Sequence, residues 1–166
     1  MKITYINDEF IATNAQGNVI GKLVYEKWAS RKAHATTHYA EFFDFTPKSF
    51  WFGQISVRQN SNEIATVKMN WKGNVLIDIK NKNDVTRFTV KTVGIFNKYV
   101  VVQDSFNNEL MAFRADSQWK TGHHNYDITI NLGFENLVTD IFVLIATYAV
   151  NNIMNLQKAA MAAGAS

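Results

Sequence analysis

The sequence predicts a mainly β protein, a closed antiparallel barrel of roughly twelve strands around a buried hydrophobic C-terminal helix. From residue 1 to about residue 133, short stretches of alternating apolar and polar residues are separated by Asn, Gly, Asp or Lys. Many short strands at such spacing are typical of antiparallel sandwiches and barrels. Beyond residue 133 the alternation gives way to one long apolar segment, which needs a place inside the fold.

The alternation is clearest in two neighbouring segments. In "VLIDIK", the apolar residues Val75, Ile77 and Ile79 fall on one face of a strand, and in "DVTRFTVKTV" Phe88 and Val90 do the same. Turn-forming residues separate other pairs, such as "AQG" between "FIATN" and "NVIGKLVYEKW", and Lys72-Gly73, where Gly73 can take positive φ. The stretch "KAHATTHYAEFF" is predicted as one strand because it is rich in Thr, Tyr and Phe.

The C-terminal segment predicts a helix over about residues 135–158, followed by a frayed, alanine-rich tail over 159–166. It contains no Gly or Pro before its end, and residues 141–150, "IFVLIATYAV", are apolar at nearly every position. A helix that is apolar on all faces is either buried or spans a membrane. An apolar run of about 10 to 14 residues favours a buried helix, and polar residues flank this run closely on both sides. No transmembrane span is expected.

A barrel of antiparallel strands offers such a helix one enclosed position, along its axis. The 166 residues show no linker and no change of composition, so we expect a single domain over 1–166.

The order of these segments resembles the superfamily of tubby C-terminal domains, phospholipid scramblases and LURP-one-related proteins. The resemblance is carried by the opening "NAQGNVIGKLVYEKW", by "GIFNKYVVVQD", and by "LVTDIFVLIATYAVNNI" at the end, and the chain is most similar to small bacterial members. It implies a barrel of about twelve strands around a central helix, and a basic surface that binds phosphoinositides. The calcium-binding segment, cysteine cluster and proline-rich arm of the scramblases have no counterpart here.

Composition excludes several kinds of function. The chain has no cysteine, which rules out disulfides and thiolate metal sites. The net charge is +3, but the basic residues are scattered, so nucleic-acid binding is not indicated. The N-terminal segment lacks the apolar core of a signal peptide, which predicts a cytoplasmic protein by default. Nothing in the sequence points to a cofactor.

Histidines occur in two pairs that resemble metal-site spacings. His34 and His38 would lie on one helix face, but the segment favours a strand, on which residues four apart are roughly 13 Å from each other. His123 and His124 are adjacent in a predicted loop, and the sequence suggests no further ligands for them. No metal site is predicted from either pair.

Evidence for an enzyme is weak. Phosphate-binding glycine loops and serine-nucleophile motifs are absent. The carboxylate pairs Asp8 with Glu9 and Glu41 with Asp44 are predicted to be solvated side chains at strand ends, and no catalytic residue is assigned.

Basic residues near tryptophans give the most concrete candidate site. Cations beside an exposed Trp suit an anionic headgroup at a membrane surface. The candidates for binding such an anion are Lys27, Arg31, Lys32, Lys68 and Lys72.

The sequence therefore predicts a non-enzymatic binding module, with an anionic membrane lipid as the candidate partner. Two alternatives remain open at this point. One is an enzyme or small-molecule-binding barrel with its site at the barrel mouth, and the other is a protein tethered to a membrane by the C-terminal helix.

Overall fold

The computed structural model describes residues 1–27, 31–48, 53–82, 84–94, 99–116 and 124–164. It contains twelve strands followed by one helix, α1 (Asp140–Gly164). The strands are β1 (Lys2–Ile6), β2 (Glu9–Thr13), β3 (Val19–Tyr25), β4 (Ala33–Thr37), β5 (Phe42–Pro47), β6 (Ile55–Gln59), β7 (Asn62–Met69), β8 (Val75–Lys80), β9 (Val85–Val93), β10 (Tyr99–Gln103), β11 (Glu109–Ala115) and β12 (Tyr126–Ile130).

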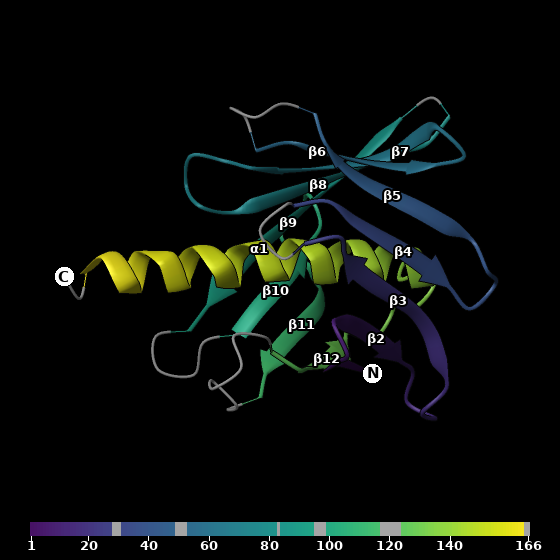
Figure 1. Cartoon of the computed structure of the whole chain (residues 1–166), viewed down its shortest axis with the longest axis horizontal. Coiled ribbons are helices and arrows are strands. Elements are labelled where there is room, and N and C mark those ends of the chain that lie inside the picture. Colours follow the sequence, from purple (N-terminus) through teal and green to yellow (C-terminus); the bar gives the residue numbers. More distant parts are fainter. Residues whose placement is uncertain (28–30, 49–52, 83, 95–98, 117–123, 165–166) are drawn as a thin grey trace.

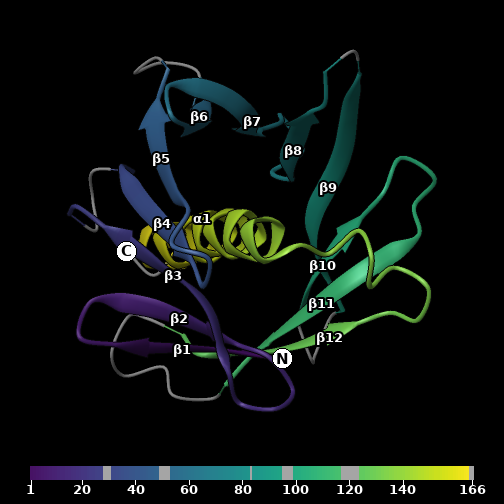
Figure 2. The ribbon, with the colours of Figure 1, turned by 90° about the vertical axis from the view of Figure 1, so that its right-hand side faces the viewer.

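The strands form one closed antiparallel barrel in which each pairs with its neighbours in sequence. The first and last strands complete the ring, with Lys2 opposite Asp127 and Ile3 opposite Tyr126. Figure 2 shows the ring of strands around α1. Closure gives each of these strands a neighbour on both sides, so the sheet has no edge strand. The predicted fold class is confirmed.

The core forms where the inward faces of the strands meet the helix. Every residue from Phe142 to Val150 is buried, which explains why this segment is apolar on all sides. The predicted inward residues Val75, Ile77, Phe88 and Val90 belong to the same core. Figure 1 shows α1 running through the barrel and continuing beyond it toward the C-terminus.

The helix makes its closest approach to the strands at β3. A Cβ atom placed on Gly21 would lie 2.8 Å from Leu144 Cδ1 and 2.8 Å from the backbone oxygen of Thr36. Glycine is therefore required here by the contact with the helix and with β4, since φ at this residue is not positive. On β4 the neighbouring inward residues Ala33 and Ala35 are also small and buried.

Because neighbouring strands alternate in direction, the connections between consecutive strands divide between two ends of the barrel. We call the end where the chain enters α1 the entry end, and it carries the turns β2–β3, β4–β5, β6–β7, β8–β9 and β10–β11. The opposite end, from which α1 emerges, is the exit end, and it carries β1–β2, β3–β4, β5–β6, β7–β8, β9–β10 and β11–β12.

Two boundaries differ from the expectation. The helix runs from Asp140 to Gly164 rather than over about 135–158, because residues 135–137 form a turn and the alanine-rich tail continues the helix. The stretch "KAHATTHYAEFF" is two strands, β4 and β5, instead of one. Their turn places Ala40 at a φ of 60°, a conformation for which alanine gives no signal in the sequence.

Candidate functional site

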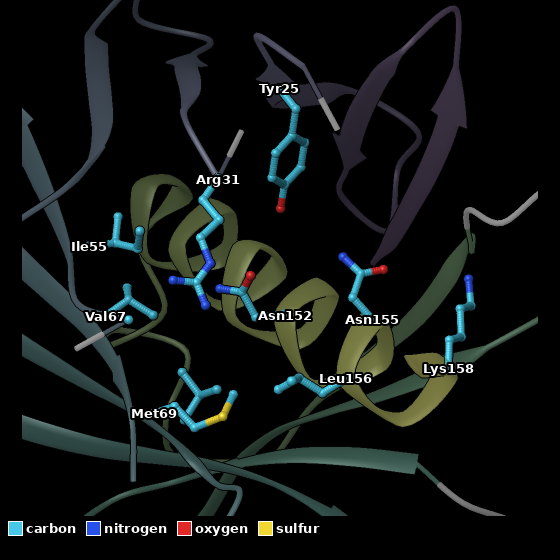
Figure 3. Close-up of a pocket in the computed structure, with 11 residues that line it drawn as sticks. Tyr25, Arg31, Ile55, Val67, Met69, Asn152, Asn155, Leu156 and Lys158 are labelled. Carbon is cyan, nitrogen blue, oxygen red and sulfur yellow. The ribbon is translucent and has the colours of Figure 1, made fainter. Parts of the chain in front are cut away.

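A pocket at the exit end, between α1 and the barrel wall, encloses about 460 Å³. We call it the exit pocket. Its lining comprises Tyr25, Arg31, Gly53, Ile55, Val67, Met69, Val75, Asn152, Asn155, Leu156 and Lys158. Figure 3 shows the Arg31 side chain reaching over the helix toward Asn152, with the apolar wall of Ile55 and Val67 beside it. The pocket therefore combines a basic, amide-bearing side with an apolar wall.

The backbone of Arg31 is hydrogen-bonded to a side chain of the core helix. The hydroxyl of Tyr148 donates a hydrogen bond of 2.7 Å to the Arg31 carbonyl oxygen. Arg31 has a φ of 56°, and Gly53 lies beside its guanidinium group, so that a Cβ at 53 would be 3.6 Å from both terminal nitrogens. These contacts connect the β3–β4 connection to α1 at the mouth of the pocket.

A buried polar network lies behind this mouth. The Tyr126 hydroxyl donates to Asn151 Oδ1 at 2.8 Å, and Asn151 Nδ2 donates to the Tyr25 hydroxyl at 3.3 Å. The rings of Tyr25 and Tyr148 stack with centroids 5.6 Å apart. Burial raises the pKa of Tyr25 well above its ordinary value, although the hydrogen bond from Asn151 acts in the opposite direction. The tyrosines therefore stay neutral and act as fixed hydrogen-bonding groups near neutral pH.

Asn152 and Arg31 both act on the Tyr148 hydroxyl. Burial raises the pKa of Tyr148 to about 12, while the hydrogen bond with Asn152 and the charge of Arg31 lower it. Asn152 and Asn155 are three residues apart and so share one face of the helix, which is the face turned to the pocket. Burial lowers the pKa of Lys158, one turn further along the helix.

The lining determines which ligands the pocket can accept. Among the described residues that line it, none carries a carboxylate, whereas Arg31 and Lys158 carry positive charge and the two asparagines supply amide donors. A guanidinium group binds carboxylate and phosphate oxygens through paired, charge-assisted hydrogen bonds. This set of groups suits an anion next to an apolar group.

Four of the five predicted basic residues lie at the exit end. Lys27, Arg31 and Lys32 belong to the β3–β4 connection, where the Glu26 amide donates to the Lys32 carbonyl at 3.1 Å. Lys72 belongs to the β7–β8 turn and lines a second hollow, which shares Met69 and Leu156 with the exit pocket. Only Arg31 of the five lines the exit pocket itself.

A cation and an exposed tryptophan meet at the β7–β8 turn. The Lys72 ammonium group lies 5.2 Å from the ring centroid of Trp71, and Trp71 is 90% exposed. Trp28, which is adjacent to Lys27 in the sequence, lies outside the described residues.

Lys68, the fifth candidate, is on the outer wall of the barrel and is already paired. Its ammonium group lies 3.1 Å from Asp78 Oδ2, and Arg87 Nε donates to Asp78 Oδ1 at 2.6 Å. Hydrogen bonds from Arg87, followed by those from Lys68, lower the pKa of Asp78 against the effect of burial. Lys68 thus serves an ion cluster that joins β7, β8 and β9, away from the exit pocket.

The histidines fall into separate environments. His34 faces outward on β4, where Nδ1 lies 2.8 Å from Asp44 Oδ1 and Nε2 lies 3.3 Å from Glu26 Oε1. His38 is in the β4–β5 turn, with Nδ1 2.6 Å from Oδ2 of Asp140, the first residue of α1. His124 is buried beside Tyr126, and His123 lies outside the described residues. Across the described residues, no three His, Asp or Glu side chains are grouped to hold a metal ion.

The carboxylates weighed for acid–base chemistry also have structural partners. Asp8 accepts a 2.7 Å hydrogen bond from the Tyr5 hydroxyl, and Glu9 pairs with Lys22 at 2.9 Å. Glu41 accepts from Thr37 at 3.0 Å. Asp44 pairs with His34, as described above.

The sequence reasoning missed Asn152, Asn155 and Lys158. The signal was present, because these polar residues follow the apolar run at helical spacing. In the sequence, however, the asparagines serve only as evidence against a membrane span, and Lys158 only as a charge that suits the end of a helix.

Comparison of the chain with family models, with curated proteins and with solved structures gives no match. Within the described residues, no helix is both long and apolar enough to cross a membrane.

Proposed function

We propose that this protein is a non-enzymatic binding module that recognises an anionic lipid headgroup at the exit end of its barrel. The observation that carries the proposal is the exit pocket, where Arg31 faces two helix amides and no described lining residue carries a carboxylate. The similarity of the strand order to the tubby and LURP-one-related superfamily supports the same class of function.

The surroundings of the pocket suit a membrane surface. Lys27, Lys32 and Lys72 are exposed at the same end of the barrel, and Trp71 projects there beside Lys72. Each lysine or arginine near an anionic bilayer contributes about 1 kcal/mol of attraction. Exposed Trp side chains favour the interface between headgroups and acyl chains. The exit end thus offers both a specific anion contact and a general attraction to anionic lipid.

Co-sedimentation with vesicles tests the proposal. Vesicles of phosphatidylcholine alone are compared with vesicles that also contain phosphatidylglycerol or a phosphoinositide, at low and at high salt. We expect binding only to the anionic vesicles, weakened by salt because exposed charges are screened. Glycerol phosphate and inositol phosphates, added free, test whether the headgroup alone competes.

Two variants separate the exit pocket from charge in general. Arg31→Gln removes the proposed anion contact and should weaken binding to anionic vesicles by about fivefold or more. Lys68→Gln removes the same charge from the outer wall and should bind as the wild type does. Failure to bind any vesicle, or an equal loss in both variants, would show that the exit pocket is not a headgroup site.

A further inference from the structure

The entry end of the barrel has a pocket of its own, which differs in chemistry from the exit pocket. The inference drawn from it does not depend on the proposed function. The pocket encloses about 320 Å³, within the range of small-molecule sites, roughly 300–1,000 Å³. We call it the entry pocket. Its lining comprises Ile64, Ile79, Lys80, Asn81, Thr86, Phe88, Asn136, Leu137, Thr139, Ile141, Phe142 and Ile145.

The walls of the entry pocket are apolar. Phe88 of β9 and Phe142 of α1 are both buried, and their ring centroids lie 4.7 Å apart. Ile79 of β8 lines the pocket, and its partner on the neighbouring strand β7 is the small residue Ala65. Leu137, in the turn before α1, is 56% exposed although it borders this hollow. The pocket is thus a hollow open to solvent whose walls are mainly apolar.

Four of the five described polar residues that line the pocket, Lys80, Asn81, Thr86 and Thr139, already have partners. The Lys80 ammonium group pairs with Glu63 at 2.5 Å, and Lys80 is the single charged residue among the described residues that line the pocket. Asn81 Nδ2 donates to Thr86 Oγ1 at 3.4 Å, and the Phe142 amide donates to Thr139 Oγ1 at 3.4 Å. A charged ligand would therefore lose its hydration without a free counter-charge to replace it, a large cost in an apolar pocket.

The charges next to the pocket argue against an anion in particular. Lys82 lies in the β8–β9 turn with Asp84, and Glu135 precedes the lining residue Asn136. Asp140, between two lining residues, is held by His38. This neighbourhood carries no excess of positive charge, in contrast to the exit end.

We propose that the entry pocket binds an uncharged apolar small molecule, such as a neutral hydrocarbon-chain compound, in contact with Phe88, Phe142 and Ile79. The hollow is sized for a ligand rather than for a protein segment, and burial of its apolar walls supplies the driving force.

Binding is measured with the fluorescent, uncharged probe N-phenyl-1-naphthylamine and the full-length chain. We expect saturable binding with one site per chain, reversed by decan-1-ol and not by decanoate, which shares the chain length but carries a charge. Competition by decanoate equal to that by decanol overturns the proposal, as does the absence of saturable binding. Sedimentation with phosphatidylcholine vesicles would show instead that this end engages bilayer acyl chains.

A filling variant and a matched control locate the site. Ile79→Trp places a large side chain in the pocket and should weaken probe binding by about tenfold or more, a loss of about 1.4 kcal/mol. Leu132→Trp adds the same side chain to a 91% exposed position at the same end of the barrel and should leave binding unchanged. Equal affinity in the wild type and Ile79→Trp overturns the proposal.

A measurement on the wild-type chain covers the case in which Ile79→Trp does not fold. With isoleucine methyl groups labelled for NMR, the probe should shift the methyl signals of Ile64, Ile79, Ile141 and Ile145. Shifts confined to Ile55, which lines the exit pocket, would place the probe at the other end and refute the assignment. The comparison of wild type with Arg31→Gln on anionic vesicles can fail without affecting these outcomes, because Arg31 lines the exit pocket and not the entry pocket.

Discussion

The two ends of this barrel share one helix and one sheet, yet they present opposite chemistries. At the exit end the helix contributes Asn152, Asn155 and Lys158 to a pocket that also contains Arg31. At the entry end it contributes Ile141, Phe142 and Ile145 to a pocket where Lys80, the one charged residue in the described lining, pairs with Glu63. The difference arises along a single helix, because its composition changes from apolar to polar after Val150.

This comparison shows how a central helix can divide a barrel into two separate sites. The middle of α1 is buried on all sides and packs against Gly21, and no described residue lines both pockets. Ligands at the two ends are therefore expected to bind independently unless the helix itself moves.

The largest expected effect comes from removing the helix, which forms a wall of both pockets. A chain that stops after Phe134 exposes the inward faces of all strands. Burial of Ile141, Phe142, Leu144, Ile145 and Tyr148 contributes of order 10 kcal/mol at about 1.5–3 kcal/mol each, comparable to the whole stability of a domain. Circular dichroism and urea denaturation should show no cooperative unfolding.

A matched truncation defines the control. A chain that stops after Ala160 loses residues beyond the barrel but retains every helix residue that lines the two pockets. We expect its urea midpoint to be close to that of the full chain. A folded, cooperative chain ending at Phe134 would contradict the role of α1 as the core.

Gly21→Ala should cause the next largest loss of stability, and it should weaken ligand binding at the two ends of the barrel unequally. Its Cβ would overlap Leu144 and the Thr36 carbonyl oxygen, and overpacking of this kind costs about 1–3 kcal/mol. Leu144 adjoins Ile145, which lines the entry pocket, so displacement of the helix should weaken the probe at the entry end more than vesicle binding at the exit end.

A double-mutant cycle tests whether contact with Leu144 causes the loss of stability in Gly21→Ala. If contact with Leu144 is responsible, Gly21→Ala and Leu144→Ala should be less destabilising together than the sum of the two single changes. Strict additivity of the unfolding free energies would show that the helix contact is not the source.

Glu63→Gln should have the smallest effect on ligand binding. It should leave Lys80 without its carboxylate partner, so that the entry pocket, like the exit pocket, presents a positive charge. Burial opposes ionisation of Glu63, but hydrogen bonds from Lys48, Lys80 and Ser56 outweigh it and lower the pKa to about 2. The variant frees Lys80 at the pocket, so decanoate should now compete with the probe. No gain in competition by decanoate would show that Glu63 does not set the charge selectivity.

The same substitution has a pH dependence with a defined sign. Because the folded-state pKa of Glu63 lies below its ordinary value of 4.5, its stabilising effect is present above that value and is lost as the pH falls toward about 2. The difference in urea midpoint between wild type and Glu63→Gln should therefore be largest near neutral pH and shrink between about pH 4.5 and pH 2.

Local pattern was enough to predict the barrel and its central helix. Alternation in segments such as β8 and β9 identified the inward residues, and Gly73 takes the expected positive φ of 78°. The β4–β5 turn was missed, because its positive-φ residue is Ala40 and the flanking residues favour a strand. The helix start was placed too early because residues 135–137 form a turn that composition does not distinguish from a helix.

The candidate site could be predicted only in part, since charge is visible in sequence and pairing is not. Arg31 and Lys68 look alike in the sequence, but one borders a pocket and the other is bound to Asp78. The bound partner comes from a neighbouring strand, and strand register decides which side chains meet.

By itself, the sequence determined the identity of the core, because a helix apolar on every side has to be enclosed and alternating strands can enclose it. The tertiary structure alone decided where the polar residues act. Closure of the barrel brings the β3–β4 connection beside the middle of α1, more than 100 residues later, as the hydrogen bond between Tyr148 and Arg31 shows. The entry pocket likewise depends on how three strands, β7, β8 and β9, pack with the helix, a property that no segment of the chain carries alone.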